Sequence, residues 1–362
     1  MPGWRRNITT WIVPPECKGL RHVNLKQLSA ILGLSQTTVS RALNGYPEVN
    51  EETRQRVLKA VEETGYRANR AAQRLATGKA HSIGLMMPTS MELDLDIHFG
   101  TFLHGLGKEA MRHDFHLVIV PTEPNDEINA LKRLAESGNA DALYIHTIRN
   151  DDKRIDRLRT LSIPFLSHGR LLGDQHDYPY LDIDNTGAFY NATKLLLDLG
   201  HTRFGLMNGL ENLTFATRRR RGMIRALSER GLMLPDENMH HSQMTDAEGF
   251  HTMQRFLALP DPPTAVICGS TVLALGAVRA INQAGLKLGQ DISMIAHDDV
   301  LPMLKPENFM IPLTTTRSSL SEAGVRIARR LIAQVQKTEE LPRQELWPAE
   351  LIIRASTGPA PK

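Results

Sequence analysis

From residue 82 onward, short apolar runs alternate with stretches of helical character, and this alternation restricts the fold more than any other feature of the chain. The apolar runs lie at 83–88, 115–121, 141–147, 163–169, 178–184, 203–209, 264–270 and 292–299. Helical stretches such as 103–114 and 192–200 separate most of them. Strands that alternate with helices form parallel sheets covered by helices. The series is too long for one sheet, so the sequence predicts two α/β subdomains.

The preceding segment, 23–65, reads as three short helices. The first contains LKQLSAIL, in which Leu25, Leu28 and Ile31 recur at helical spacing. Gly33 supplies a tight turn, because only glycine turns there without a steric penalty from a Cβ. Ser35 is the expected N-cap of the second helix, QTTVSRALN.

The third helix is predicted to begin at Asn50. Glu51 and Glu52 follow in its first turn, where the positive end of the helix dipole favours carboxylates. The helix is expected to end near Gly65. The next residues, 69–79, are small, basic and weakly apolar, so they read as a linker or as a marginal helix that buries little by itself.

Two helices joined by a glycine turn, the second polar and basic at its start, form the pattern of a helix-turn-helix. The second helix of such a motif enters the major groove of DNA. Gln36, Thr37 and Arg41 can point toward base edges, because Gln pairs with adenine, Arg pairs with guanine and a Thr methyl meets thymine. Thr38 and Ser40 are better placed to contact phosphate. An ordinary surface helix is the alternative for this segment alone.

The charge distribution agrees with a nucleic-acid partner. Residues 1–80 contain 13 Lys and Arg against 6 Asp and Glu, whereas the whole chain carries only +3. The remaining residues are therefore net acidic. A basic head on an acidic body predicts a polyanionic partner for the head, although a solvated basic face would give the same count.

The amino-acid composition and the two cysteines indicate the cellular compartment in which the protein is expected. Apolar residues make up 41% and charged residues 23%, as in proteins with packed cores. No run of about 18 apolar residues exists, so no membrane span is expected. Residues 1–22, interrupted by Pro14 and Pro15, do not resemble a secretory signal and read as a disordered extension or a misassigned start. Cys17 and Cys268 offer no disulfide framework, which fits a reducing cytoplasm.

A series of motifs follows in a fixed order along the chain. The first are VSRALN, VNEETRQRV, ETGYRANRAAQRLATG and SIGL. Further on come LGH at 199–201, RRRG at 219–222, LALGAVRAINQAGLKLGQDISMIAHDD at 273–299, PLTTTR at 312–317 and ELIIRAST at 350–357. In content and spacing the series resembles the lactose-repressor (LacI/GalR) family of transcriptional regulators over about residues 23–357.

The resemblance implies an α/β architecture with a helical head. An extension over 1–22 would precede a helix-turn-helix domain over 23–68 and a hinge helix and linker over 69–80. An effector-binding and dimerisation core over 81–362 would follow, similar to periplasmic binding proteins and built of two doubly wound α/β subdomains. The chain would cross between these subdomains near 183–185 and 311–317.

The resemblance places DNA contacts on the second helix and in the hinge. They comprise Gln36, Thr37, Thr38, Ser40, Arg41, Asn69, Ala72 and Leu75. Leu75 would enter the minor groove, because an apolar side chain inserted between base steps kinks DNA and lets more of the protein touch it. Ordinary interdomain packing is the alternative for Leu75. A hinge that folds only on DNA would be the natural switch element.

The resemblance also implies an effector, a mono- or disaccharide, in a cleft between the subdomains. The implied effector-binding residues are His98, Phe99, His146, Arg170, Arg219, Ser270 and Asp298. A charged donor such as Arg219 and an acceptor such as Asp298, facing across a cleft, suit sugar hydroxyls. Phe99 can stack on a sugar face, and for the two histidines a structural role is the alternative. Three neighbouring arginines, Arg218, Arg220 and Arg221, are expected in solvent.

The chain departs from the family pattern in the cleft. Ser270 and Thr271 stand where many relatives have Asn-Asp, which weakens the implied role of Ser270. Gly169 stands where some sugar-responsive members carry aspartate, so the effector is not expected to be held as the lactose repressor holds its inducer. The HGR stretch at 168–170 resembles a subgroup tied to α-glucoside use.

Catalytic patterns do not compete with this interpretation. The sequence has no G-x-S-x-G elbow, Walker loop or H-E-x-x-H helix. Neither 240–241 nor 297–299 supplies a chelating set, because adjacent strand residues point to opposite faces. We therefore expect that the protein is not an enzyme and that it binds no metal and no cofactor.

The sequence predicts a cytoplasmic repressor that binds operator DNA as a homodimer and has no membrane partner. It leaves open whether the effector releases the protein from DNA or promotes its binding. A solute-binding protein of a transport system is the alternative, which the helix-turn-helix disfavours.

Overall fold

The computed structural model describes residues 23–43, 45–66, 74, 78–89, 97–173, 177–338 and 342–362. The chain divides into two units, a head over 1–79 and a body over 80–362. Three predicted hinge residues, Asn69, Ala72 and Leu75, lie outside the described residues.

Residues 23–66 of the head form the helices α1 (Leu25–Leu32), α2 (Gln36–Leu43) and α3 (Glu51–Thr64). Gly33 ends α1 in the left-handed region, with a φ of 66°. Ser35 Oγ accepts a hydrogen bond from the amide of Thr38, so the structure confirms the predicted N-cap of α2. The side chain of Asn50 caps α3, and Gly65 follows its last residue as the C-cap, so the helix ends near Gly65 as the sequence predicts.

The head has its own hydrophobic core. Leu28, Val39 and Val57, one from each helix, are fully buried at its centre. Ile31, one of the residues at helical spacing on α1, is 61% exposed, and Leu32 packs against the core together with Leu25. At about 100° per residue, Leu32 points within about 20° of Leu25, whereas Ile31 points about 120° away.

The body is built on two six-stranded sheets of the same topology. Their orders are β11-β5-β4-β3-β1-β2 and β12-β10-β9-β8-β6-β7. The strands of the first sheet are β1 (Ser82–Pro88), β2 (His116–Thr122), β3 (Ala142–Ile145), β4 (Phe165–His168), β5 (Tyr180–Ile183) and β11 (Gln344–Trp347). Those of the second are β6 (Phe204–Asn208), β7 (Met239–His241), β8 (Ala265–Cys268), β9 (Ser293–Asp298), β10 (Thr314–Arg317) and β12 (Glu350–Ile352). Among these strands, only the β10–β12 pair is antiparallel.

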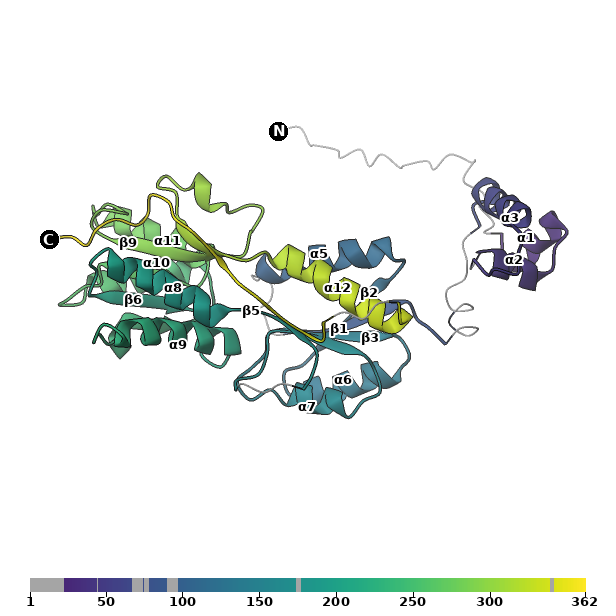
Figure 1. Cartoon of the computed structure of the whole chain (residues 1–362), viewed down its shortest axis with the longest axis horizontal. Helices are drawn as coiled ribbons and strands as arrows, with labels where there is room; N and C mark the ends of the chain where they lie inside the picture. The colour runs from purple at the N-terminus through teal and green to yellow at the C-terminus, as the bar shows by residue number, and fades with distance from the viewer. Residues whose placement is uncertain are drawn as a thin grey trace, which may run out of the picture. The chain divides into compact units, whose positions relative to one another are not determined.

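Helices cover both faces of each sheet, so the predicted pair of doubly wound α/β subdomains is confirmed (Figure 1). The first sheet carries α5 (Ile97–Arg112) and α12 (Leu320–Gln336) on one face and α6 (Glu127–Glu136) and α7 (Lys153–Arg159) on the other. The second carries α8 (Asn185–Asp198) and α9 (Thr214–Ser228) opposite α10 (Asp246–Leu257) and α11 (Thr271–Gln283). Short 3-10 turns lie at Asp236–Asn238 and Pro306–Asn308. We call the two sheets with their helices the first and second lobes.

The chain passes between the lobes three times. The first passage follows β5 near 183–185, and the second follows β10, directly after 311–317. A third, between β11 and β12, was not predicted; Figure 1 shows this C-terminal segment in yellow. Strands β7, β10, β11 and β12 are not among the eight predicted apolar runs. The TTTR of β10 contains no apolar side chain, and β7 and β12 have only three residues each.

Helices α8 and α9 pack so closely that only glycine fits at position 222. A Cβ on Gly222 would lie 2.2 Å from the carbonyl oxygen of Thr186. We predict that Gly222→Ala lowers the free energy of unfolding by about 1–3 kcal/mol, as overpacked sites do. Urea denaturation followed by circular dichroism measures the change. Gly107→Ala is the control, because its Cβ would meet only Leu117 at an ordinary 3.6 Å; an equal loss in both variants would contradict the packing explanation.

Candidate functional site

A cavity of about 230 Å³ lies where strands of both sheets end. His146, His168 and Asp182 reach it from the ends of β3, β4 and β5 in the first lobe. Phe215 and Asp299 reach it from the second lobe, after β6 and β9. Parallel strands bring their carboxyl ends to one edge of a sheet, so residues far apart in sequence converge at this cleft.

Arg219, on α9, is the most buried cation of the cleft, with 5% of its surface exposed. Its Nε donates to Asn185 Oδ1 at 2.7 Å, and its Nη1 donates to the carbonyl of Gly269 at 2.8 Å. The rings of Phe189 and Phe215 lie 5.1 and 4.8 Å from its guanidinium carbon. Within the part of the chain that the structure describes, Nη2 has no acceptor. Arg219 therefore offers one charged donor to the cavity.

Asp299 is the matching anion. Its two carboxylate oxygens lie 3.4 Å from His297 Nε2 and 3.4 Å from His98 Nε2. Burial alone would raise the pKa of Asp299, but His297, His98 and Arg219 outweigh burial and hold it at about 2. Burial lowers the pKa of Arg219 to about 10, against the attraction of Asp299 and Asp182. Both side chains are therefore ionised at neutral pH.

Asp298, the acid predicted for the effector, does not line the cavity. Its Oδ1 accepts from the amide of Val300 at 2.8 Å, and its Oδ2 lies 3.8 Å from Arg317 Nε. Since successive strand residues point to opposite faces, Asp299 shares the cleft side with His297, and Asp298 turns away.

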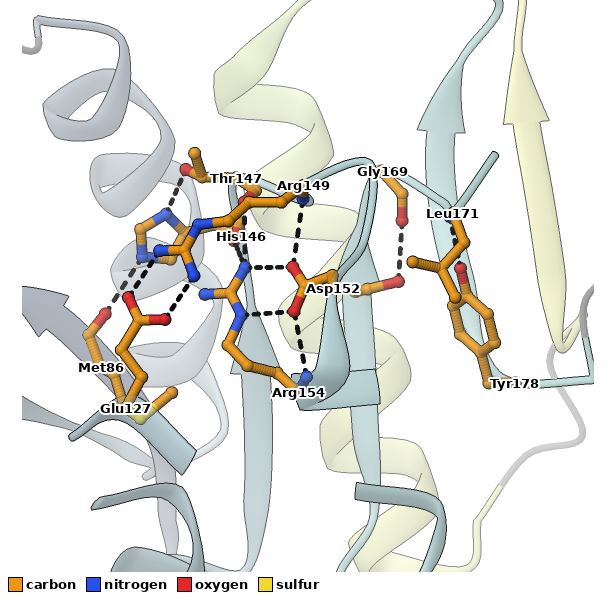
Figure 2. Close-up of polar contacts among 11 residues, drawn as sticks. Met86, Glu127, His146, Thr147, Arg149, Asp152, Arg154, Gly169, Leu171 and Tyr178 are labelled. Atoms are coloured by element: carbon orange, nitrogen blue, oxygen red, sulfur yellow. Dashed lines mark hydrogen bonds and ion pairs between the residues drawn. The ribbon is translucent and has the colours of Figure 1, made fainter. Parts of the chain in front are cut away.

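One wall of the cavity is a stack of flat rings. Phe102 stacks on Tyr144 with centroids 4.6 Å apart and on His168 at 5.3 Å. Phe99 packs against His146 at 4.8 Å, and His146 against Tyr144 at 5.7 Å. Figure 2 shows His146 bound to its neighbours: its Nδ1 lies 2.7 Å from Thr147 Oγ1 and its Nε2 lies 3.1 Å from the carbonyl oxygen of Met86. These contacts hold the ring in place.

A second carboxylate, Asp182, lines the cavity from β5 and is paired from behind. Arg170, predicted to contact the effector, does not line the cavity; its Nε donates to Asp182 Oδ2 at 3.0 Å. Burial raises the pKa of Asp182, with Arg218 and Arg170 acting in the opposite direction. Arg218 was predicted to be solvated and is 6% exposed, because its guanidinium donates to the carbonyls of Arg170 and Leu171.

Ser270 also lies behind the cavity. It is fully buried, and its Oγ accepts from the amide of Leu273 at 3.1 Å, which makes it the N-cap of α11. The other arginines of the 218–221 run differ: Arg221 is exposed as predicted, whereas Arg220 is half-buried and pairs with Glu211 at 3.1 Å.

Of the seven predicted effector residues, four therefore line the cavity and three lie outside its lining. Those that line it are His98, Phe99, His146 and Arg219; those outside are Arg170, Ser270 and Asp298. Sequence reasoning missed Asp182, Asn185, Phe215, His297 and Asp299. The strand alternation in 297–299 was the available signal for Asp299, because it separates the two adjacent carboxylates.

The predicted base-reading residues share the outer side of α2. Gln36, Thr37 and Arg41 are exposed, whereas Thr38 and Ser40 are half-buried. Thr38 Oγ1 lies 2.8 Å from Ser35 Oγ, so this hydroxyl takes part in the helix cap.

Among the described residues, no three His, Cys, Asp or Glu side chains gather closely enough to hold a metal ion. None of the helices in that part of the chain combines the length and the apolarity needed to span a bilayer.

Comparisons with known proteins agree over both units. Residues 80–355 match the family model described as periplasmic binding proteins and sugar binding domain of LacI family, and residues 30–69 match that of bacterial regulatory proteins, lacI family. The chain is 67% identical to the HTH-type transcriptional regulator AglR of Rhizobium meliloti (strain 1021), covering 94% of this chain and 95% of that protein.

Two solved structures share the fold. The lac repressor dimer bound to operator and the anti-inducer ONPF has a TM-score of 0.78 at 24% identity and covers 93% of this chain and 99% of that one. The transcriptional regulator CelR–cellobiose complex has a TM-score of 0.66 at 24% identity and covers 92% of this chain and 99% of that one.

A helix-turn-helix head followed by a two-lobed binding body defines a class of DNA-binding transcriptional regulators. This chain belongs to the LacI family of bacterial regulatory proteins. It is a transcriptional regulator, not an enzyme, and the alternative of a transport solute-binding protein is wrong, because the relative at 67% identity regulates transcription.

The cleft makes a prediction about pH. Burial lowers the pKa of His168 from 6.5 to about 4. Between these values the unfolded chain binds the proton and the folded chain does not, so stability falls as pH drops from 6.5 to 4. The free energy of unfolding should therefore fall with pH in the unaltered protein. We predict that, over this interval, the fall is up to about 3 kcal/mol smaller in His168→Gln. Urea denaturation at pH 7.5, 6.0 and 4.5 tests this. Parallel pH profiles for the two proteins would contradict the assignment.

Proposed function

We propose that this regulator is a repressor whose affinity for operator DNA is controlled by an uncharged sugar bound in the cleft. The observation that supports it best is the arrangement of the cavity. Arg219, whose Nη2 has no acceptor among the described residues, and Asp299 line a space of about 230 Å³ together with a wall of aromatic rings.

Sugars present hydroxyl edges and apolar faces, and the cavity has a surface suited to each. Arg219 donates and Asp299 and Asp182 accept, which suits hydroxyl groups that do both. Phe99 and Phe102 supply flat apolar surface for the carbon face of a ring.

The charges of the cavity favour a neutral ligand. Arg219 is compensated by Asp299, and Asp182 by Arg170. A charged ligand would find no uncompensated partner here, and burying an unpaired charge is costly.

We assign the predicted residues two kinds of role. His98, Phe99, His146 and Arg219 contact the effector, together with Asp299 in the place predicted for Asp298. Arg170, Ser270 and Asp298 position the contacting groups from behind. The CelR structure, with its cellobiose, shares this two-lobed fold.

The head would read operator DNA through α2, with the protein acting in the cytoplasm as a homodimer on a pseudo-palindromic site. Gln36, Thr37 and Arg41 are exposed and positioned for base edges, and Thr38 and Ser40 for phosphate. Asn69, Ala72 and Leu75 would complete the interface as the hinge. A homodimer matches two half-sites by its own symmetry.

Control by the effector requires that the ligand prefer one arrangement of the two lobes. A sugar that contacts Arg219 in the second lobe and Phe99 in the first stabilises the arrangement in which both reach it. That arrangement would set the spacing of the two hinges in the dimer and hence the affinity for operator.

The effector contact is tested on Arg219. A thermal-shift screen with mono- and disaccharides first identifies sugars that raise the melting temperature. Arg219→Ala removes a charged donor, and such hydrogen bonds contribute roughly 1.5–3 kcal/mol. We therefore expect calorimetry to show about 10- to 150-fold weaker sugar binding, with operator binding retained and its response to sugar lost.

Arg221→Ala is the matched control, because Arg221 is exposed on the same helix. If Arg221→Ala loses the response and Arg219→Ala keeps it, the cleft assignment fails. If no sugar raises the melting temperature, the sugar effector itself is refuted.

The DNA contact is tested on Arg41. A bidentate contact to guanine contributes about 1–3 kcal/mol of discrimination. We expect Arg41→Ala to weaken binding to an operator selected from genomic fragments by about 5- to 150-fold, and binding to random DNA much less. Fluorescence anisotropy at fixed salt measures both affinities. Equal losses on the two DNAs would reduce Arg41 to a phosphate contact.

A further inference from the structure

A second cavity, of about 380 Å³, adjoins the first. The two cavities share the side chains of His98, His146, Thr147, Leu213, Phe215 and Met244 along their boundary. Together they form a space with two compartments, and the proposed sugar contacts of Arg219 and Asp299 account only for the first.

The first lobe contributes a buried arginine to the second compartment. Arg154 is 5% exposed and lines this cavity. Its Nε and Nη2 bind Asp152, and Nη2 also donates to the carbonyls of His146 and Thr147 (Figure 2). No residue in the described part of the chain accepts a hydrogen bond from Nη1. A donor of this kind is available to a bound molecule.

The charges of this wall are balanced pair by pair. Arg149 donates to both carboxylate oxygens of Glu127, at 2.6 and 2.7 Å, and Arg154 is paired with Asp152. Figure 2 shows the two pairs side by side. Because each cation has its own carboxylate, the wall presents N–H donors without net positive charge. A phosphate would remain uncompensated there, whereas a hydroxyl group needs only a donor or an acceptor.

The second lobe contributes Gln243, between β7 and α10. Its backbone is held in place: the carbonyl accepts from Ser242 Oγ at 3.1 Å and from the amide of Thr245 at 2.8 Å. Its half-buried side-chain amide has no hydrogen-bond partner among the described residues. An amide carries both donors and an acceptor, as hydroxyl recognition requires.

We propose that the second compartment binds the second ring of an uncharged disaccharide, and that Gln243 determines this specificity. The first ring occupies the compartment of Arg219 and Asp299, so the inference rests on the proposed function. Arg154 Nη1 and the Gln243 amide contact hydroxyl groups of the second ring from opposite lobes. A monosaccharide fills only the first compartment.

The experiment varies two things, the number of sugar rings in the ligand and the side chain at position 243, and measures the binding affinity. Calorimetry on the full chain measures dissociation constants for maltose, sucrose, cellobiose and lactose, for glucose, fructose and galactose, and for glucose 6-phosphate. We expect at least one disaccharide to bind ten or more times tighter than its component monosaccharides and than the phosphate. Gln243→Ala should weaken the binding of that disaccharide about 3- to 10-fold, which corresponds to the loss of one neutral hydrogen bond. The affinities for the monosaccharides should stay unchanged.

Gln254→Ala is the matched control, because Gln254 is an exposed glutamine on α10 outside both cavities. Monosaccharides that bind as tightly as every disaccharide would overturn the second-ring site while the sugar-controlled regulator stands. Equal weakening of mono- and disaccharides by Gln243→Ala, or tighter binding of the phosphate, would also overturn it. If no sugar binds, the proposed function and this inference fail together.

Discussion

The cleft depends on one buried charge, the guanidinium of Arg219. A cation taken out of water is tolerated only where hydrogen bonds and opposite charge replace the lost hydration. Here Asn185 on α8 and the carbonyl of Gly269 after β8 accept its protons, and Asp299 after β9 opposes its charge. These partners come from separate elements of the second lobe, so satisfying one cation fixes the ends of several elements relative to one another. Arg219 lines the cavity and its Nη2 has no acceptor among the described residues, so the cation that organises the lobe also offers a hydrogen-bond donor to a ligand.

The two lobes are held together by backbone contacts as well as by the three chain passages. The amide of Asn150 donates to the carbonyl of Asn212 at 2.8 Å, and the amide of Thr214 donates to the carbonyl of Ile148 at 2.9 Å. The buried pair of Arg154 and Asp152 lies directly beside this contact and shapes the loop that makes it. Ile148 and Thr214 of these segments also line the cavity, so a ligand in the cleft would lie beside the contacts that join the lobes. This proximity gives a physical route from effector binding to lobe arrangement, which two-state control requires.

Sequence reasoning succeeded where a local rule decides the outcome. Helix caps at Ser35 and Asn50 depend on residues a few positions away, and the eight predicted strands depend on local apolar patterning. It failed where the partner is remote. Arg218 was placed in solvent because four successive arginines on one helix cannot all face one cleft, yet its acceptors are carbonyls 47 and 48 residues away. Strand β10 was missed because its buried threonines carry no apolar signal.

By itself the sequence determined the family, the helix-turn-helix head, the α/β order of the body and the arginine of the cleft. Each of these features can be recognised from contiguous residues or from motifs of constant spacing. Only the tertiary structure decided which of two adjacent aspartates faces the cavity, that Arg170 and Ser270 stand behind it, and that a second compartment opens beside the first. The reason is physical. A side chain's chemistry is set by its own residue, whereas its access to a ligand is set by the strand pleat, by sheet pairing and by partners that parallel strands bring together from distant parts of the chain.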